Sequence, residues 1–332
     1  MIVPFLLAWQ SIAQGSTPIG LDAATLQAHV KFLASDALEG RGTPSRGLNI
    51  AAEYIASNYQ RFDLEAPVEK SYFQWAVVRG RDGIDSKAAN VVGVIPGSDP
   101  KLKEQAIIVT AHYDHLGKTE REQDDQIFNG ANDDASGTAC VLGLAEAFAR
   151  GPKPKRTLIF VALYGEERGL LGSRHYIANP IWPLKSTIAN LNLEHMGRTD
   201  DSDGPQFKSV NLTGFDFSDM ASFFVNAGKA SGVKFWKHEK NSDGFFARSD
   251  NAAFAMAGIP AHTMSVAYVF PDYHGAGDHW DKVDYGNMST VLTAIYQGLT
   301  EMANSPNVPK WDQTNPKVQR YRDAYQKLQG GS

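Results

Sequence analysis

The chain contains a single cysteine, Cys140, among its 332 residues. A disulfide needs two cysteines, so none can form within the chain, and a zinc site built on several thiolates is excluded as well. Cys140 lies inside the apolar run TACVLGLAEAF, where a free cysteine behaves as a small buried hydrophobic residue. Any metal bound by this chain therefore has to be held by imidazole and carboxylate groups.

An excess of positive charge is also missing. Lysine and arginine number 32 against 37 aspartate and glutamate residues, which gives a net charge of -5 at pH 7 and a pI near 6.0. No segment gathers basic side chains into the stripe with which nucleic-acid-binding proteins attract phosphates, so we expect no nucleic-acid partner. The 42% hydrophobic content is ample for a packed core, in one large domain or two smaller ones.

Long hydrophobic runs are missing after the first residues. No later segment approaches the roughly 20 apolar residues of a membrane-spanning helix, so we expect no membrane span. The beginning, MIVPFLLAWQSIAQG, resembles a secretion signal without its basic start, with Ser11 and Ala13 as the small residues that precede a cleavage site. The alternative is a short apolar arm packed on the body of the protein. We expect a signal peptide over residues 1–13, and hence a secreted or periplasmic protein.

Several catalytic motifs are absent as well. The sequence contains no G-x-S-x-G elbow of a serine hydrolase and no phosphate-binding glycine loop of the Walker type. His238 and Glu239 begin an H-E-x-x-H zinc motif but lack its second histidine. The chemistry of the chain therefore has to come from another set of residues.

Strand-like and helix-like segments alternate along the chain. The strand-like segments are continuous apolar runs, which is typical of strands buried on both faces. Such strands, alternating with helices, form mostly parallel sheets with helices on both sides. We predict a single-domain three-layer α/β/α sandwich with a mostly parallel central sheet, from residue 20 to residue 325. The expected strands span residues 72–78, 90–95, 105–113, 156–164, 186–193 and 259–266, and the expected helices residues 26–35 (capped by Asp22), 48–62, 137–150, 168–178, 219–232, 249–258, 286–304 and 318–328.

Imidazole and carboxylate groups follow several of these apolar runs or lie in glycine-bearing loops. They are His112, Asp133, Glu166, Glu167, Glu194 and His274. In sheets of this kind, ligands bind beyond the carboxyl ends of the strands. Nitrogen and oxygen ligands in this number suit two zinc ions, and two metals can clamp the attacking and developing oxygens of a displacement. The pattern predicts a hydrolytic two-metal site.

Two of these positions also have simpler explanations. His112 and Asp114 lie two residues apart, so an extended backbone puts them on one side, with Asp114 as the partner that orients a metal-binding imidazole. The alternative is a solvated loop pair. Asp133 and Asp134 precede a helix that either residue can cap. Because glycines flank this pair, we expect instead a tight backbone and a carboxylate that bridges two cations.

The pairs that follow the next two apolar runs have alternatives of the same kind. Glu166 and Glu167 form an exposed acidic turn unless one of them binds a metal and the other carries a proton. A zinc-bound water has a pKa near 7, and a nearby carboxylate can take its proton and return it to a leaving amine. Glu194 and His195 end a buried strand, and either of them can ligate a metal.

Seven motifs, in the same order along most of the chain, resemble the zinc aminopeptidase family of bacterial leucyl aminopeptidases, which also includes glutamate carboxypeptidases and zinc-dependent glutaminyl cyclases. The motifs are LASDALEGRG (33–42), NVVGVIPG (90–97), AHYDHLG (111–117), GANDDASG (130–137), EERGLLGS (166–173), RSDNAAF (248–254) with AGIPA (257–261), and YHGAGDHWDKVDY (273–285). The resemblance implies a two-zinc exopeptidase with the fold expected above.

The resemblance also implies the roles of individual residues. One zinc is held by His112 and Glu194, the other by Glu167 and His274, and Asp133 bridges both, with a cis peptide bond to Asp134. Further roles fall to residues around the metals: Glu166 is the general base, and Arg248 and Tyr273 match positions that in some relatives contact the substrate or stabilise the oxyanion.

The chain departs from the family pattern at several places. Glu194 stands where aspartate is usual, and the extra methylene requires a small shift of the metal or the strand. His195 is unusual, and we expect it to line the substrate pocket. Asn251 stands where histidine is common. Between Ile55 and Asn90 the chain is too short for the protease-associated domain that many secreted relatives insert.

The function expected from this pattern is that of a metallo-aminopeptidase with two Zn²⁺ ions per chain. A metal-bound hydroxide would hydrolyse the N-terminal residue from peptide substrates, with Glu166 as the general base. A carboxypeptidase or dipeptidase of the same family is an alternative, with Arg248 as the group that binds the substrate carboxylate. Glutaminyl cyclase activity is less favoured, because those enzymes bind one zinc. An alternative of another class is a non-catalytic, receptor-like binding module, whose relatives have lost ligands or the base.

Overall fold

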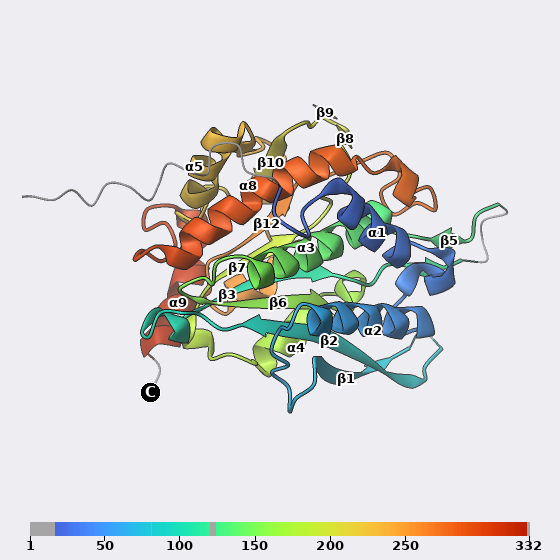
Figure 1. Ribbon diagram of the computed structural model, residues 1–332, viewed down its shortest axis with the longest axis horizontal. Helices are drawn as coiled ribbons and strands as arrows, with labels where there is room; N and C mark the ends of the chain where they lie inside the picture. The colour runs from blue at the N-terminus through green and yellow to red at the C-terminus, as the bar shows by residue number, and fades with distance from the viewer. Residues whose placement is uncertain (1–16, 81, 120–123, 331–332) are drawn as a thin grey trace, which may run out of the picture.

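The computed structural model describes residues 17–80, 82–119 and 124–330, so the signal peptide predicted over residues 1–13 lies outside the described residues. Its centre is an eight-stranded sheet in the order β1–β2–β6–β3–β7–β12–β10–β11 (Figure 1). The strands are β1 (Phe73–Arg79), β2 (Asp85–Ile95), β3 (Ala106–His112), β6 (Thr157–Leu163), β7 (Thr187–Leu193), β10 (Ser209–Leu212), β11 (Lys234–Trp236) and β12 (Ala261–Ser265). Two small ribbons lie outside it, formed by β4 (Gly117–Lys118) with β5 (Ile127–Phe128) and by β8 (Asp200–Asp201) with β9 (Gly204–Pro205).

The middle of the sheet is parallel. Strands β6, β3, β7 and β12 pair in parallel with one another, whereas β1 and β2 are antiparallel and β10 runs antiparallel to β12. Every residue of β3 and β6 is buried, which explains why these strands are continuous apolar runs. The prediction of a mostly parallel sheet is confirmed, and the four parallel strands end at one edge.

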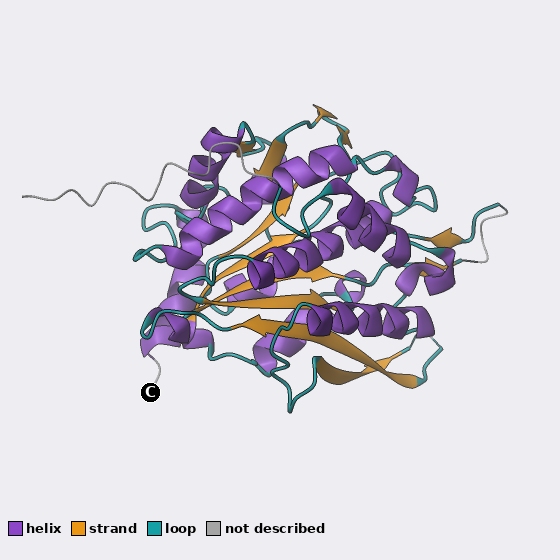
Figure 2. Cartoon of the chain, viewed as in Figure 1, coloured by secondary structure: helices purple, strands orange, loops and turns teal. Residues whose placement is uncertain are grey.

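Helices cover both faces of the sheet (Figure 2). Ile107 and Val109 of β3 pack into the same core as α1, α2, α3, α5 and α8, while Ile108 between them packs into a second core with α4, α7 and α9. This confirms the three layers. The helices are α1 (Ala23–Leu33), α2 (Arg46–Arg61), α3 (Gly137–Arg150), α4 (Leu171–Ala178), α5 (Ala221–Ser231), α6 (Asn241–Gly244), α7 (Asn251–Met256), α8 (Tyr285–Asn304) and α9 (Gln319–Gly330).

Local sequence signals account for most of these elements. The predicted cap of α1 is present, because the Asp22 carboxylate accepts a hydrogen bond from the backbone N–H of Thr25 at 3.0 Å. Strands β10 and β11 are not predicted by the sequence, since runs of four and three residues are too short to show a periodicity. Among the described helices, none is both long and apolar enough to cross a membrane.

A buried arginine joins the segments that will carry the functional residues. Arg41 is fully buried, and its guanidinium donates to the carbonyl oxygens of Tyr113 at 2.7 Å, Asn129 at 2.8 Å, Gly130 at 3.0 Å and Leu33. Burial lowers its pKa to about 10, against the opposing effect of nearby carboxylates. The arginine of the LASDALEGRG motif therefore fixes the backbone just after β3 to the backbone before α3.

Replacing Arg41 by methionine should lower the free energy of unfolding by about 3–5 kcal/mol, because four buried carbonyl groups lose their donor and nearby buried carboxylates lose a positive charge. Urea unfolding monitored by circular dichroism measures the change. Arg46→Met, at an exposed arginine that begins α2, is the matched control and should stay within about 0.5 kcal/mol of the unmutated protein. Equal stability of the two variants would contradict this role of Arg41.

Candidate metal centre

Three of the five predicted metal ligands, together with the predicted base Glu166, lie at the carboxyl ends of three neighbouring strands. His112 is the last residue of β3, Glu166 and Glu167 follow β6, and Glu194 directly follows β7. Because β6, β3 and β7 are adjacent and parallel, their ends meet at one edge of the sheet. The structure thus brings together residues that lie up to 82 positions apart in the chain.

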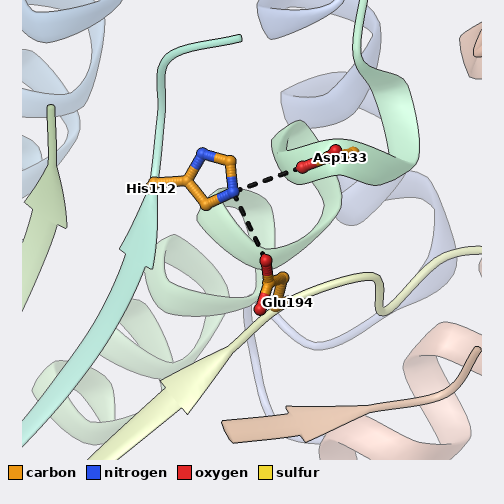
Figure 3. Close-up of side chains that lie close together, drawn as sticks. All are labelled: His112, Asp133 and Glu194. Carbon is orange, nitrogen blue, oxygen red and sulfur yellow. Dashed lines mark ion pairs between the residues drawn. The ribbon is translucent and has the colours of Figure 1, made fainter. Parts of the chain in front are cut away.

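A first cluster forms around the imidazole of His112 (Figure 3). Its Nε2 lies 3.2 Å from Oδ1 of Asp133 and 3.8 Å from Oε1 of Glu194. The other ring nitrogen, Nδ1, lies 3.2 Å from the backbone carbonyl oxygen of Asp114, which orients the ring. The Asp114 carboxylate lies 3.5 Å from Nδ1 and accepts hydrogen bonds from the backbone N–H of Glu166 and from the Thr43 hydroxyl. Asp114 therefore holds both the imidazole and the turn of the glutamate pair.

A second cluster lies on the other side of Asp133. Oδ2 of Asp133 lies 3.2 Å from Nε2 of His274 and 3.9 Å from Nδ1 of His115. Oε1 of Glu167 lies 3.4 Å from the same nitrogen of His274 and 2.9 Å from that of His115. Each oxygen of Asp133 thus faces its own group of imidazole and carboxylate ligands, which is the arrangement of a bridging carboxylate.

The backbone around Asp133 is held tightly, as the flanking glycines predict. The Asp133–Asp134 peptide bond is cis, as the family resemblance implies. Gly130 has a φ of 58°, and a Cβ there would lie 2.3 Å from the carbonyl oxygen of Asp133. The Asp278 carboxylate accepts the backbone N–H groups of Asn132 and Asp133. The Asp134 carboxylate belongs to neither group of candidate ligand atoms.

Asp134 serves instead as a link between the ends of α3 and β7. Its Oδ1 accepts hydrogen bonds from the backbone N–H groups of Gly137 and His195, at 3.0 and 3.2 Å. Burial raises the pKa of this carboxyl well above its ordinary value. Burial also disfavours the charged form of Asp133, but the surrounding imidazoles of His195, His112 and His274 outweigh it and hold the pKa well below the ordinary value.

Several buried polar atoms in the two clusters lack hydrogen bonds, which tests whether a metal fits. They are Nε2 of His112, both ring nitrogens of His115 and Oε1 of Glu167; Nε2 of His195, 3.5 Å from Oδ1 of Asp133, also lacks one. An unsatisfied buried polar group costs about 1–3 kcal/mol, and a divalent cation removes that cost by accepting lone pairs. Atoms bound to a tetrahedral zinc ion lie about 3.3 Å apart. The distances of 2.9 to 3.9 Å within the clusters scatter around this value, so the residues fit zinc at two positions.

A cavity of about 340 Å³ opens beside the clusters. Glu166, His195, Arg248 and Tyr273 line it together with the predicted metal ligands Asp133, Glu167, Glu194 and His274. The Tyr273 ring stacks on His274 with centroids 4.0 Å apart, and the exposed Arg248 guanidinium lies over the Phe245 ring. His195, which the sequence analysis expects in the substrate pocket, lies in the wall of this cavity.

Sequence reasoning missed three residues near the clusters. His115 follows His112 by three positions inside the AHYDHLG motif, and that spacing is a signal that could have found it. Asp278 lies within the motif that contains His274. Asp250, whose pKa burial raises to about 7, accepts a hydrogen bond from the Ser173 hydroxyl behind the site. No periodicity distinguishes such supporting carboxylates from surface ones.

A model of peptidase family M28 matches residues 90–298, which is more than half of the chain. The chain belongs to peptidase family M28. The matched region contains every residue that the sequence predicts to bind metal, and the family resemblance inferred from the seven motifs is confirmed.

Related proteins agree with this membership. A probable zinc metalloprotease from Pyrenophora tritici-repentis is 30% identical over 318 residues, which cover 85% of this chain and 62% of that protein. Leupeptin-inactivating enzyme 1 from Streptomyces exfoliatus is 30% identical over 265 residues, which cover 78% of this chain and 52% of that protein. The chain thus spans between half and two thirds of the length of these relatives.

The solved structures confirm the fold. A zinc aminopeptidase from Bacillus subtilis aligns with a TM-score of 0.67 at 16% identity, covering 92% of this chain and 98% of that one. At such low identity the likeness establishes the α/β architecture rather than the activity. The family membership and the nitrogen and oxygen atoms of the two clusters make zinc the metal for which this centre is suited.

Removing zinc should destabilise the protein, because buried carboxylates then repel one another without a cation. A chelator should lower the melting temperature, and zinc added at 100 times its Kd should restore about 2.7 kcal/mol of stability. Differential scanning fluorimetry measures the shift. Magnesium at the same concentration is the control and should have little effect, since it prefers oxygen ligands. A melting temperature insensitive to both chelator and zinc would contradict a metal centre at this place.

Proposed function

We propose that this member of family M28 is a two-zinc aminopeptidase that removes the N-terminal residue from peptides. The observation that carries the proposal is the position of Asp133, whose two oxygens face two separate groups of ligands. One cation would be held by His112, Glu194 and Asp133, and the other by Glu167, His274 and Asp133. Bound zinc polarises a carbonyl oxygen and lowers the pKa of a coordinated water.

Glu166 is the residue that we assign to proton transfer. It lines the cavity, and its backbone N–H is fixed by the Asp114 carboxylate at 3.1 Å. Burial, together with the carboxylates of Glu194 and Asp250, raises its pKa well above the ordinary value. A carboxylate of raised pKa is suited to take a proton from water and to deliver it to the leaving amine.

The remaining cavity residues would orient the substrate. The Tyr273 hydroxyl is the donor that we assign to the developing oxyanion, since its ring is fixed by stacking on His274 and by an edge contact with His195. The free α-ammonium group of a peptide is attracted by the carboxylates around the cavity. His195 lines the cavity wall beside them.

Charge supports an aminopeptidase over a carboxypeptidase. Among the residues that line the cavity, Arg248 is the one with a guanidinium or ammonium group, and it is exposed and stacked on Phe245. Four carboxylates line the same cavity, those of Asp133, Glu166, Glu167 and Glu194. A substrate carboxylate therefore finds one guanidinium and no ammonium group in the cavity wall.

We further propose that residues 20–325 form one peptidase domain without an inserted protease-associated domain, and that the protein is secreted or periplasmic. The single central sheet supports the first proposal. The apolar segment before residue 13, with its small residues at positions 11 and 13, supports the second.

Glu166→Gln should reduce kcat by about 10²–10⁴-fold, because the amide cannot accept the proton, while zinc content stays near that of the unmutated protein. Hydrolysis of an aminoacyl arylamide and metal analysis of the purified variant measure the two effects. Glu301→Gln, at an exposed position of α8, is the matched control and should change neither. Full activity of Glu166→Gln would defeat the proposed mechanism.

A substrate pair separates the two exopeptidase activities. The protein should hydrolyse leucyl arylamide and leave an N-blocked dipeptide with a free carboxylate nearly intact, because the blocked amine can no longer be held by the carboxylates. Arg248→Gln should change kcat/KM for the arylamide by less than about threefold, as expected for a surface residue that holds no charged group of that substrate. Preferred cleavage of the blocked dipeptide, lost in Arg248→Gln, would instead establish a carboxypeptidase.

A further inference from the structure

His115 lies within the second cluster, but the proposed function gives it no role. It is fully buried, and both of its ring nitrogens lack hydrogen bonds. A neutral imidazole has one donor and one acceptor, and burying them without partners costs about 1–3 kcal/mol each. The side chain is therefore placed where something other than the described residues can satisfy it.

The atoms that face Nδ1 of His115 are carboxylate oxygens of the second cluster. Oε1 of Glu167 lies 2.9 Å away and Oδ2 of Asp133 lies 3.9 Å away, and neither forms a hydrogen bond with this nitrogen. These three atoms lie close enough together to bind one ion. Oε1 of Glu167 is itself buried without a hydrogen-bond partner. The lone pairs of Nδ1 of His115, Oε1 of Glu167 and Oδ2 of Asp133 are therefore directed at one place between these three side chains.

A role toward the substrate does not explain His115. The cavity is lined by Glu166, His195 and Tyr273, among others, but His115 is not part of its wall. His195 also has an unpartnered nitrogen, which lies 3.5 Å from Oδ1 of Asp133, but the His195 side chain also lines the cavity. For His115, the point between Asp133 and Glu167 is the place where a partner can bind.

The position of the ring is fixed by its surroundings. A Cβ at Gly130 would lie 2.5 Å from Cγ of His115, so the ring packs directly against glycine backbone. The backbone N–H of His115 donates to the carbonyl oxygen of Arg41 at 3.3 Å. The ring of His274 lies edge-on, with centroids 5.9 Å apart. These contacts hold the imidazole beside Glu167 before any ion binds.

We propose that His115 is a further ligand of the cation that Asp133, Glu167 and His274 hold, so that this position is bound by two imidazoles and two carboxylates. The inference rests on the proposed two-cation site. The position at His112 then has one imidazole and two carboxylates. Four protein ligands complete a tetrahedral zinc site, whereas three leave a place for water or substrate. The two cations are therefore unequal: the one at His115 is retained and the one at His112 exchanges.

Zinc affinity tests this inequality without measuring peptide hydrolysis. Titration of the zinc-loaded protein with a chromogenic chelator should release one equivalent readily and the second only at much higher chelator concentration. In His115→Ser the affinity of the second equivalent should fall by about tenfold or more. His175→Ser, at a partly buried histidine of α4 outside the clusters, is the matched control and should release zinc as the unmutated protein does. Unchanged affinities in His115→Ser would overturn the proposal.

A crystal structure of the zinc-loaded, unmutated protein distinguishes a ligand from a residue that only positions Glu167, and it decides the matter if His115→Ser does not fold. Anomalous scattering should place a zinc ion about 2.0–2.1 Å from Nδ1 of His115. A zinc ion bound by Glu167 and His274 with His115 hydrogen-bonded to Glu167, or no zinc ion at this position, would overturn the inference. Zinc bound by His115 in a protein that cleaves no peptide would contradict the proposed function alone.

Discussion

Mutual repulsion of buried carboxylates is the constraint on which the rest of this structure depends. Asp133, Glu166, Glu167 and Glu194 line one small cavity, and Asp114 and Asp134 lie fully buried behind it. Carboxylates so placed cannot all remain charged unless cations lie among them. Burial and the neighbouring carboxylates raise the pKa of Glu166, whereas the surrounding imidazoles hold the pKa of Asp133 well below its ordinary value.

Strand pairing and core packing keep these carboxylates close together despite their repulsion. Parallel pairing of β6, β3 and β7 fixes the carboxyl ends of the strands side by side, and two apolar cores hold the sheet in place. Between strand and helix, two buried charged side chains fix the loops: Arg41 through backbone carbonyls and Asp278 through backbone N–H groups. Since both act on backbone atoms, the positions of His112 and Asp133 depend on residues that touch no substrate.

The sequence predicts site residues best where a polar side chain ends an apolar run. An apolar run that ends in His112 or Glu194 points to the site, because polar groups at the end of a buried strand need a partner. His115 and Asp278 escape this reasoning, since they lie in loops where polar residues are common and their burial follows from tertiary packing alone. Strands β10 and β11 escape it for another reason, because so few residues show no period. Periodicity thus predicts the layers, while the supporting loops require the folded chain.

The two groups of atoms in the centre differ in their members and in their distances. On the side of Glu194, the carboxylate lies 3.8 Å from His112, farther than the 3.2 Å to Asp133, and the neighbouring His195 faces the cavity. On the side of Glu167, contacts of 2.9 and 3.4 Å join two imidazoles to one carboxylate oxygen. The first group thus contains one imidazole and the second contains two, and His274 of the second group has the most exposed of these side chains. If each group binds a cation, as proposed, the group with two imidazoles holds its cation with one more ligand.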